Sequence, residues 1–397
     1  MAAVLLLILS ALQGVLALPW LHALEIIGGR DREGKRRSSW LGECLTVVGM
    51  ASALFGGLAY FAPNPVIARI FGFILQTQLI VAIALSTPHL LGIFWPKGAA
   101  IAYAAFREGV RQPMFLLLFG GALMAMLVSL VLPYFTFGED YKMMYELGFD
   151  IIMFVSLAFA CIAASMFISE EIEGRTAVTL LSKPVSRFDF LIGKYVGILL
   201  AAFLMLFLLG SILQSFLVVR QWIEKMDPVP PPQWTLHLLE ALYFNKEQGL
   251  FLGNMGIWFQ LSQEVLANLV LCFCQVSVMT AVAVALSTRV PITVNLPVIA
   301  TIFLLSHLTP VVVAVTGSQL SDQADGVVTL LNFTGKAFYA ILPDLELFRV
   351  SVAVLGDTPL PASIYWAHVI STLVYALIYM AVPLMLGLVL FEGRDVG

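Results

Sequence analysis

Nine long apolar stretches run through this sequence, and they constrain its fold more than any other feature. Each holds about 20 or more mostly apolar residues, which at about 1.5 Å per residue allows an α-helix to cross a hydrocarbon core of about 30 Å. We therefore predict an all-α fold, a polytopic membrane helix bundle. The expected spans are residues 2–27, 41–62, 67–95, 114–136, 149–169, 190–219, 262–288, 291–315 and 362–391.

The composition agrees with a membrane protein and excludes other classes. Apolar residues make up 60% of the 397 residues and charged residues only 12%, about half of the share in a soluble domain. The mean hydropathy is +0.95. Too little polar surface is available for a soluble or disordered protein, and a net charge of −4 gives no attraction for nucleic acid.

The first stretch has two readings, a cleaved signal peptide or a retained span. It lacks a basic segment at its start, and its apolar character continues past Pro19 to Ile27. A signal peptide has an apolar core of only about 7 to 15 residues. We favour the retained span.

Basic residues predict the orientation of the chain in the membrane, because cytosolic loops are enriched in Lys and Arg. The loop 30–37 contains five basic residues. If this loop is cytosolic, most other basic residues of the short loops lie on the same side. We expect a multi-pass protein of the cell (plasma or inner) membrane, with its N-terminus outside and its C-terminus in the cytosol.

A polar island, Ser169–Gly197, separates two spans on the expected cytosolic side. We expect Glu170, Glu171 and Glu173 in the first turn of a short helix, where negative charge suits the helix dipole. Pro184 should end this helix, because the residue before a proline avoids the α conformation. A short amphipathic helix on the membrane face is a shape that another protein can bind.

Three pieces of this island resemble the signature between the second and third core spans of type-2 ABC-transporter permeases. They are Glu171-Ile172-Glu173-Gly174-Arg175-Thr176, Leu180-Leu181-Ser182-Lys183-Pro184-Val185-Ser186-Arg187 and Gly193-Lys194. The resemblance is strongest to the subgroup linked to multicopper-enzyme maturation and gliding motility. In this family the segment is a coupling helix that docks on the ATPase subunit, which implies the same role for about residues 170–189. The residues assigned to ATPase coupling in this way are Glu170, Glu171, Glu173, Arg175, Thr176, Lys183, Pro184 and Arg187.

Two further segments are similar to elements of these permeases. Residues 96–113 resemble the amphipathic elbow helix, with Arg107 and Arg111 four residues apart on its polar face. Residues 341–348, which include Pro343-Asp344-Leu345-Glu346, resemble a Pro-(Asn/Asp)-Leu-Glu element before the last span. The apolar elbow residues that we expect to face lipid are Ala102, Phe106 and Val110. Gly193 and Gly197 should form a GxxxG helix contact.

The resemblance covers about residues 97–393 and predicts three parts of the chain. Residues 1–95 are expected to be an N-terminal three-span extension, which lies outside the family's core. Residues 96–113 are the elbow helix. The six-span permease core is expected at 114–393, with the coupling helix at 170–189 and outer loops at 220–261 and 316–361.

Catalytic and nucleotide-binding motifs are not convincing in this sequence. Residues 29–36 fit G-x-x-x-x-G-K, but Arg36 stands where Ser or Thr must hold magnesium, and no strand precedes the loop. HExxH and GxSxG motifs are missing, and the cysteines form no CxxC pair. We therefore predict that the chain is not an enzyme and holds no metal or other cofactor, with ATP and Mg²⁺ bound by a partner subunit.

Gln260, Glu264, Asn268 and Gln275 recur on one face of the predicted seventh span. Polar groups within spans are candidates for function. This face is either a lining for a substrate path, a polar seam between two subunits, or ordinary hydrogen bonding between helices.

These patterns favour one function over two others. The preferred hypothesis is the membrane-spanning permease subunit of an ATP-binding-cassette export system, moving an unidentified substrate. Its expected partners are a cytosolic ABC ATPase, a second permease subunit in a homo- or heterodimer, and membrane lipid. The alternative is a non-transporting membrane anchor or assembly component that recruits a cytosolic ATPase. An ion-coupled secondary transporter is disfavoured by the scarcity of charge within the spans.

Overall fold

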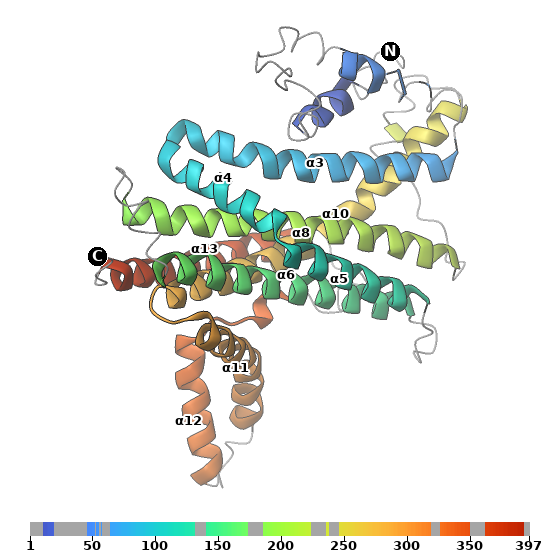
Figure 1. Cartoon of the computed structure of the whole chain (residues 1–397). Coiled ribbons are helices and arrows are strands. Elements are labelled where there is room, and N and C mark those ends of the chain that lie inside the picture. The colour runs from blue at the N-terminus through green and yellow to red at the C-terminus, as the bar shows by residue number, and fades with distance from the viewer. Residues whose placement is uncertain are drawn as a thin grey trace, which may run out of the picture. The chain divides into compact units, whose positions relative to one another are not determined.

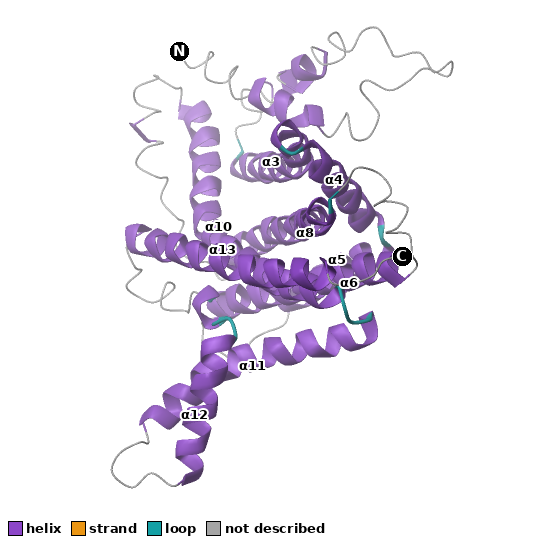
Figure 2. Ribbon diagram, turned by 90° about the vertical axis from the view of Figure 1, so that its left-hand side faces the viewer, coloured by secondary structure: helices purple, strands orange, loops and turns teal. Residues whose placement is uncertain are grey.

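The computed structural model describes residues 11–19, 46–51, 53–54, 57, 64–131, 140–173, 186–223, 236–237, 246–318, 326–349 and 362–392. Every regular element in these ranges is a helix (Figure 2). In lipid each backbone polar group needs an internal partner, and a helix provides one within its own segment. The predicted all-α fold is confirmed.

The helices follow one another along the chain with short connections between several of them (Figure 1). They are α3 (Pro65–Phe94), α4 (Pro96–Arg111), α5 (Pro113–Val131), α6 (Asp140–Glu173), α8 (Arg187–Ile223), α10 (Lys246–Ser287), α11 (Ile292–Ser318), α12 (Gly326–Ile341), the 3₁₀ helix η1 (Glu346–Phe348) and α13 (Ala362–Glu392).

In the described part of the chain, seven helices are long and apolar enough to cross a membrane. They are α3, α5, α6, α8, α10, α11 and α13, and each coincides with one of the last seven predicted spans. The first two predicted spans, 2–27 and 41–62, lie mostly outside the described residues. α10 already begins at Lys246, so it extends into the segment that we expected to be the outer loop 220–261.

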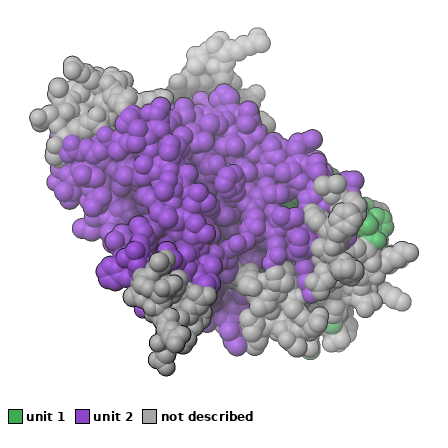
Figure 3. All heavy atoms as spheres, turned by 90° about the horizontal axis from the view of Figure 1, so that it is seen from below, with its two compact units in different colours: residues 1–90, 210–266 green, residues 91–209, 267–397 purple. Residues whose placement is uncertain are grey.

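The chain divides into two compact units (Figure 3). Unit 1 comprises residues 1–90 and 210–266, and unit 2 comprises residues 91–209 and 267–397. α8 begins in unit 2 and ends in unit 1, whereas α10 begins in unit 1 and ends in unit 2. The predicted division at residue 95 stays a prediction.

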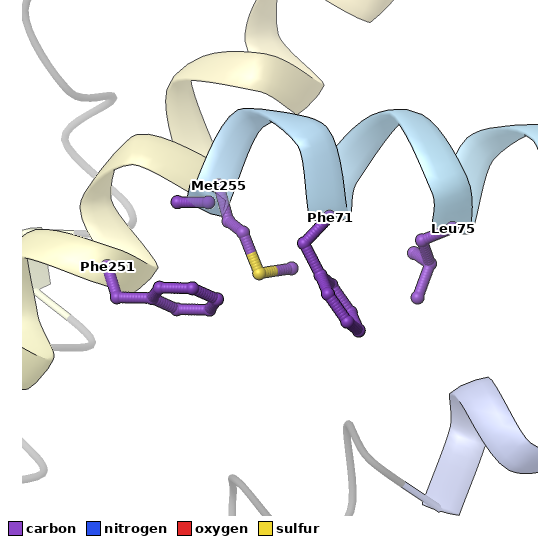
Figure 4. Packing of buried hydrophobic residues seen from close by; sticks show 5 residues of the cluster. Phe71, Leu75, Phe251 and Met255 are labelled. Atoms are coloured by element: carbon purple, nitrogen blue, oxygen red, sulfur yellow. The ribbon is translucent and has the colours of Figure 1, made fainter. Parts of the chain in front are cut away.

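The core of unit 1 forms where α3 and α10 pack together. Phe71 and Leu75 of α3 lie beside Phe251 and Met255 of α10 in one buried cluster (Figure 4). The Phe71 and Phe251 rings are 6.4 Å apart between centroids. This packing explains why α10 starts so early, because the residues around Phe251 bury their apolar side chains against α3 instead of forming a loop.

A polar network accompanies this cluster within unit 1. The Trp258 Nε1–H donates to Gln76 Oε1 at 2.8 Å, and Gln214 Nε2 donates to Ser262 Oγ at 2.8 Å. Gln76 Nε2 in turn donates to Gln214 Oε1 at 3.2 Å. Mutual pairing of this kind satisfies amides between helices that lie in an apolar surrounding.

In unit 2, small residues allow α4 and α8 to approach closely. A Cβ placed on Gly193 would lie 2.9 Å from Gly98 O, and one on Gly197 would lie 2.6 Å from the Ala105 Cβ. A Cβ placed on Gly109 of α4 would similarly lie 3.2 Å from the Ala201 Cβ. The predicted GxxxG contact is confirmed, and its partner is the elbow helix.

This contact corrects the predicted orientation of α4. Ala102 and Phe106 are 0% and 4% exposed, so they are buried in the protein instead of facing lipid, and Val110 is half-buried. The face with the small residues is also the apolar face of α4. Close packing of this face against α8 gains dispersion contacts that lipid chains match less well.

We predict that Gly197→Ala destabilises the protein by about 1 to 3 kcal/mol, the usual cost of overpacking a tight contact. Cys161, Cys272 and Cys274 are free and buried, so in a Cys44→Ser background a maleimide dye that reacts on heating reports unfolding. Gly121→Ala is the matched control, because a Cβ on Gly121 has no neighbour within 4 Å. Equal melting temperatures for the two variants would contradict the proposed α4–α8 contact.

Candidate functional site

The predicted coupling segment, residues 170–189, runs from the last turn of α6, which ends at Glu173, to the first turn of α8, which begins at Arg187. Residues 174–185 are outside the described residues, so Arg175, Thr176, Lys183 and Pro184 have no described position. The side chains of Glu170 and Glu173 are likewise not described. The structure therefore shows the frame that holds this segment: the ends of α6 and α8 and the helices packed against them.

We predicted that the glutamates of this segment begin a separate short helix, and this prediction is wrong. Glu170, Glu171 and Glu173 form the last turn of α6. No Gly or Pro occurs between Gly148 and Gly174, so nothing interrupts the later part of the helix, and Gly is the residue that commonly follows a helix end. Carboxylates at the C-terminal end of a helix are opposed by the helix dipole, so this turn benefits from a nearby cation.

Lys194 of α8 supplies that cation. Its Nζ lies 2.6 Å from Glu171 Oε1 and 3.5 Å from Glu108 Oε2 of α4, and the side chain is only 6% exposed. Burial raises the pKa of the Glu171 carboxyl, while Lys194 acts in the opposite direction. One ammonium group thus joins α4, α6 and α8 beside the coupling segment.

A capping box starts α8. Ser186 Oγ accepts from the Asp189 N–H at 3.0 Å, and Asp189 Oδ2 accepts from the Ser186 N–H at 3.2 Å. This reciprocal pairing satisfies two backbone donors at the helix start. Trp95 Nε1 donates to Asp189 Oδ1 at 2.5 Å, which ties the start of α8 to the residue before α4. Asp189 was not among the predicted site residues, although the pattern Ser-x-x-Asp at 186–189 signals such a cap.

Arg187 binds the protein's own C-terminal helix. Its Nη1 donates to the carbonyl oxygens of Phe391 at 2.5 Å and Glu392 at 2.8 Å, and the guanidinium lies 5.3 Å from the centre of the Phe391 ring. The last carbonyls of a helix have no partner within the helix. Arg187 therefore caps α13 and links it to the start of α8.

The two arginines of the elbow helix are exposed, as expected for its polar face. Arg107 lies over the Tyr103 ring, 5.6 Å from its centre. Arg111 is in the last turn of α4, where a cation suits the helix dipole.

The four polar residues predicted on one face of α10 have different surroundings. Glu264 is exposed and Gln260 is partly buried. Asn268 is buried and bonded to two tyrosines: Asn268 Nδ2 donates to Tyr145 Oη at 2.5 Å, and the Tyr365 hydroxyl donates to Asn268 Oδ1 at 2.9 Å. Asn268 thus matches the reading of hydrogen bonding between helices.

Asn268 and Gln275 also line a cavity of about 470 Å³ within unit 2. Its wall comes from three places: the early part of α6, the middle of α10 and the segment around η1. The lining residues are Tyr145, Glu146, Phe149, Asp150, Met153, Asn268, Cys272, Gln275, Glu346, Phe348 and Arg349. Tyr145 precedes Glu171 by 26 positions, or about 39 Å along α6, so the cavity and the coupling segment are near opposite ends of this helix.

The Pro-Asp-Leu-Glu element builds one wall of this cavity. Asp344 Oδ1 accepts from the Glu346 N–H at 3.1 Å, and the Asp344 N–H donates to Tyr375 Oη of α13 at 3.0 Å. Leu345 and Phe348 are buried. The turn fixed by Asp344 therefore anchors the element and leaves Glu346 at the cavity.

No group of three metal-ligating side chains is found in the described ranges. His307 Nδ1 lies 3.0 Å from Phe303 O, and His368 Nε2 lies 3.1 Å from Leu347 O. Both rings are used in hydrogen bonds to backbone carbonyls.

The fold and these two sites define a polytopic membrane protein. Near one end of α6, ion pairs and helix caps join the helices around residues 170–189, and near its other end lies a polar cavity. The family model described as ABC-2 family transporter protein matches residues 122–396. This match covers more than half of the chain, so the chain belongs to that family, whose members are type-2 ABC-transporter permeases. A search of curated proteins gave no match.

We predict that Lys194→Met destabilises the protein by about 3 kcal/mol, because it leaves Glu171 partly buried without its cation. The double variant Lys194→Met with Glu171→Gln should recover most of this loss. The melting temperature is measured by the maleimide labelling of the buried cysteines on heating, as for Gly197→Ala. A double variant as unstable as the sum of the two single variants would show that the two groups do not interact.

Proposed function

We propose that this chain is the membrane-spanning permease subunit of an ABC export system, and that a separate cytosolic subunit hydrolyses ATP. The observation that carries the proposal is the family match over residues 122–396, because family members are membrane components of ABC systems. The polar signature at 171–187 supports the export-type subgroup named above. ATP and Mg²⁺ would bind to the partner subunit, which leaves this chain without a catalytic role.

In this proposal the ATPase subunits close on ATP and push on residues 170–189. The frame around that segment supports such a role. Lys194 joins α4, α6 and α8, and Arg187 joins α8 to α13. A force on the segment would therefore move four helices together, as a two-state change biased by nucleotide requires.

The remaining parts of the proposal concern assembly and orientation. Two permease subunits, identical or different, would form the path between them, and the coupling segment would face the cytosol together with the C-terminus. Glu264, exposed on α10, would lie in that path or in the seam between subunits. No specific observation favours the alternative of a non-transporting anchor.

We predict that Arg175→Glu, in the coupling segment, lowers the ATPase activity of the assembled complex about tenfold, since charge reversal at a docking surface exchanges attraction for repulsion. ATPase activity and co-purification are measured with the complex in lipid nanodiscs. We choose Arg175 over Glu171 because Glu171 is paired with Lys194, and its reversal would also disturb the fold.

Arg289→Glu is the matched control for this experiment. Arg289 is exposed in the turn between α10 and α11, on the same expected side of the membrane but outside the coupling segment. Full ATPase activity and normal co-purification of Arg175→Glu would contradict the proposed docking. Equal loss in both variants would show a general charge effect.

A further inference from the structure

We propose that the cavity between α6, α10 and the η1 segment binds a small organic cation: a positively charged nitrogen on an apolar frame that also carries a hydrogen-bond acceptor. The inference rests on the proposed permease function and deepens it by naming a substrate class. The cavity volume of about 470 Å³ lies within the range of about 300 to 1,000 Å³ that is typical of sites for small molecules.

The charge of the lining favours a cation. Three carboxylates line the cavity, those of Glu146, Asp150 and Glu346, against the single guanidinium of Arg349. Arg349 Nη2 is already held by both Asp150 oxygens, at 2.8 Å and 3.0 Å. Glu146 and Glu346 form no ion pair with the described part of the chain. The wall therefore keeps two carboxylates available for a positive ligand.

Gln275 independently indicates a ligand. Gln275 is only 1% exposed and is one of the lining residues, and its buried Nε2 has no hydrogen-bond partner among the described residues. A buried donor without a partner carries a desolvation cost that a bound acceptor would remove. The ligand should therefore present a carbonyl, ester or similar oxygen to Gln275.

Aromatic and thioether side chains complete the lining. Phe149 and Phe348 offer ring surface and Met153 offers an adaptable apolar side chain. Aromatic faces attract cations, and methionine adapts to irregular apolar shapes. The Phe149 ring is held in place by Tyr145, at 4.7 Å between ring centroids, and the Tyr145 hydroxyl is held by Asn268. The apolar wall is thus built in advance of binding.

The experiment uses the purified full chain in lipid nanodiscs and rhodamine 6G, a fluorescent organic cation with an apolar ring system and an ester carbonyl. Binding is followed by fluorescence anisotropy. We expect saturable binding to the unaltered protein. Glu346→Gln and Gln275→Leu should each raise the Kd about tenfold, because each removes a hydrogen-bonding or charged partner of the ligand. Fluorescein ethyl ester, which has a similar shape without the positive charge, should bind at least tenfold more weakly.

Two control variants separate these effects from changes in folding. Glu392→Gln removes an exposed carboxylate at the end of α13, outside the cavity lining. Thr280→Val removes a buried hydroxyl of α10 whose one hydrogen bond among the described residues is to Val276 O. Both should bind the dye as the unaltered protein does. If Glu346→Gln fails to fold in the thermal assay, Glu146→Gln takes its place.

The proposal is overturned by an unchanged Kd in Glu346→Gln and Gln275→Leu, or by equally tight binding of the fluorescein ester. The assay contains no ATPase subunit, so it is independent of the test of the proposed function. A cation site without coupled ATP hydrolysis would contradict the permease role alone, whereas normal coupling without dye binding would contradict the cation site alone.

Discussion

One ammonium group, that of Lys194, stands between the two carboxylates of Glu171 and Glu108, and the described frame of the coupling segment depends on it. A lysine that is 6% exposed is costly unless it is paired. Here the pairing also offsets the unfavourable carboxylate at the end of α6. The interaction requires α4, α6 and α8 to lie close enough for the Lys194 side chain to reach both carboxylates. It therefore depends on the close packing of α4 against α8.

Small residues provide this closeness. Gly193 and Gly197 of α8 leave no room for a side chain against Gly98 and Ala105, so the elbow helix lies directly on α8. Glu108 is one residue before Gly109, which faces Ala201 of α8. Close packing therefore brings the Glu108 carboxylate near Lys194 as well. Steric fit and charge pairing stabilise the same arrangement, and neither would be as effective alone.

Hydropathy predicted the seven described spans because the backbone in lipid has few alternatives to a long helix. Hydropathy did not predict which face of each helix packs against protein and which faces lipid. Ala102 and Phe106 are apolar residues that suit lipid or protein equally well, and only the glycines on α8 decide between the two. The predicted boundary at the end of α6 was wrong for a related reason, because three glutamates after an apolar span are typical of the start of a new helix. The pairing with Lys194, 23 positions later, makes the continuation favourable.

The cavity shows a stronger limit of sequence reasoning. Its polar residues on α10 were found by their helical spacing, yet the residues that complete it come from 145–153 and 346–349, which are far apart in the chain. The family resemblance pointed to Pro343–Glu346 without assigning it a place. Only the fold shows that Asp344 holds the turn that brings Glu346 to the same cavity as Gln275.

The two sites have opposite energetic characters, and this difference follows from their positions on α6. At Glu171 the charges are paired and α4, α6 and α8 are joined by Lys194, which suits the proposed transmission of force through this segment. At the other end of α6, Gln275 has no hydrogen-bond partner and Glu146 and Glu346 have no ion-pair partner within the described part of the chain, which would leave binding energy for the proposed ligand. α6 is a continuous helix of 34 residues, so a displacement at its paired end would reach the cavity wall at Tyr145 and Phe149. In the proposed permease, a ligand held there by a few polar contacts would lose them when the wall moves, which would release it after each cycle of ATP hydrolysis.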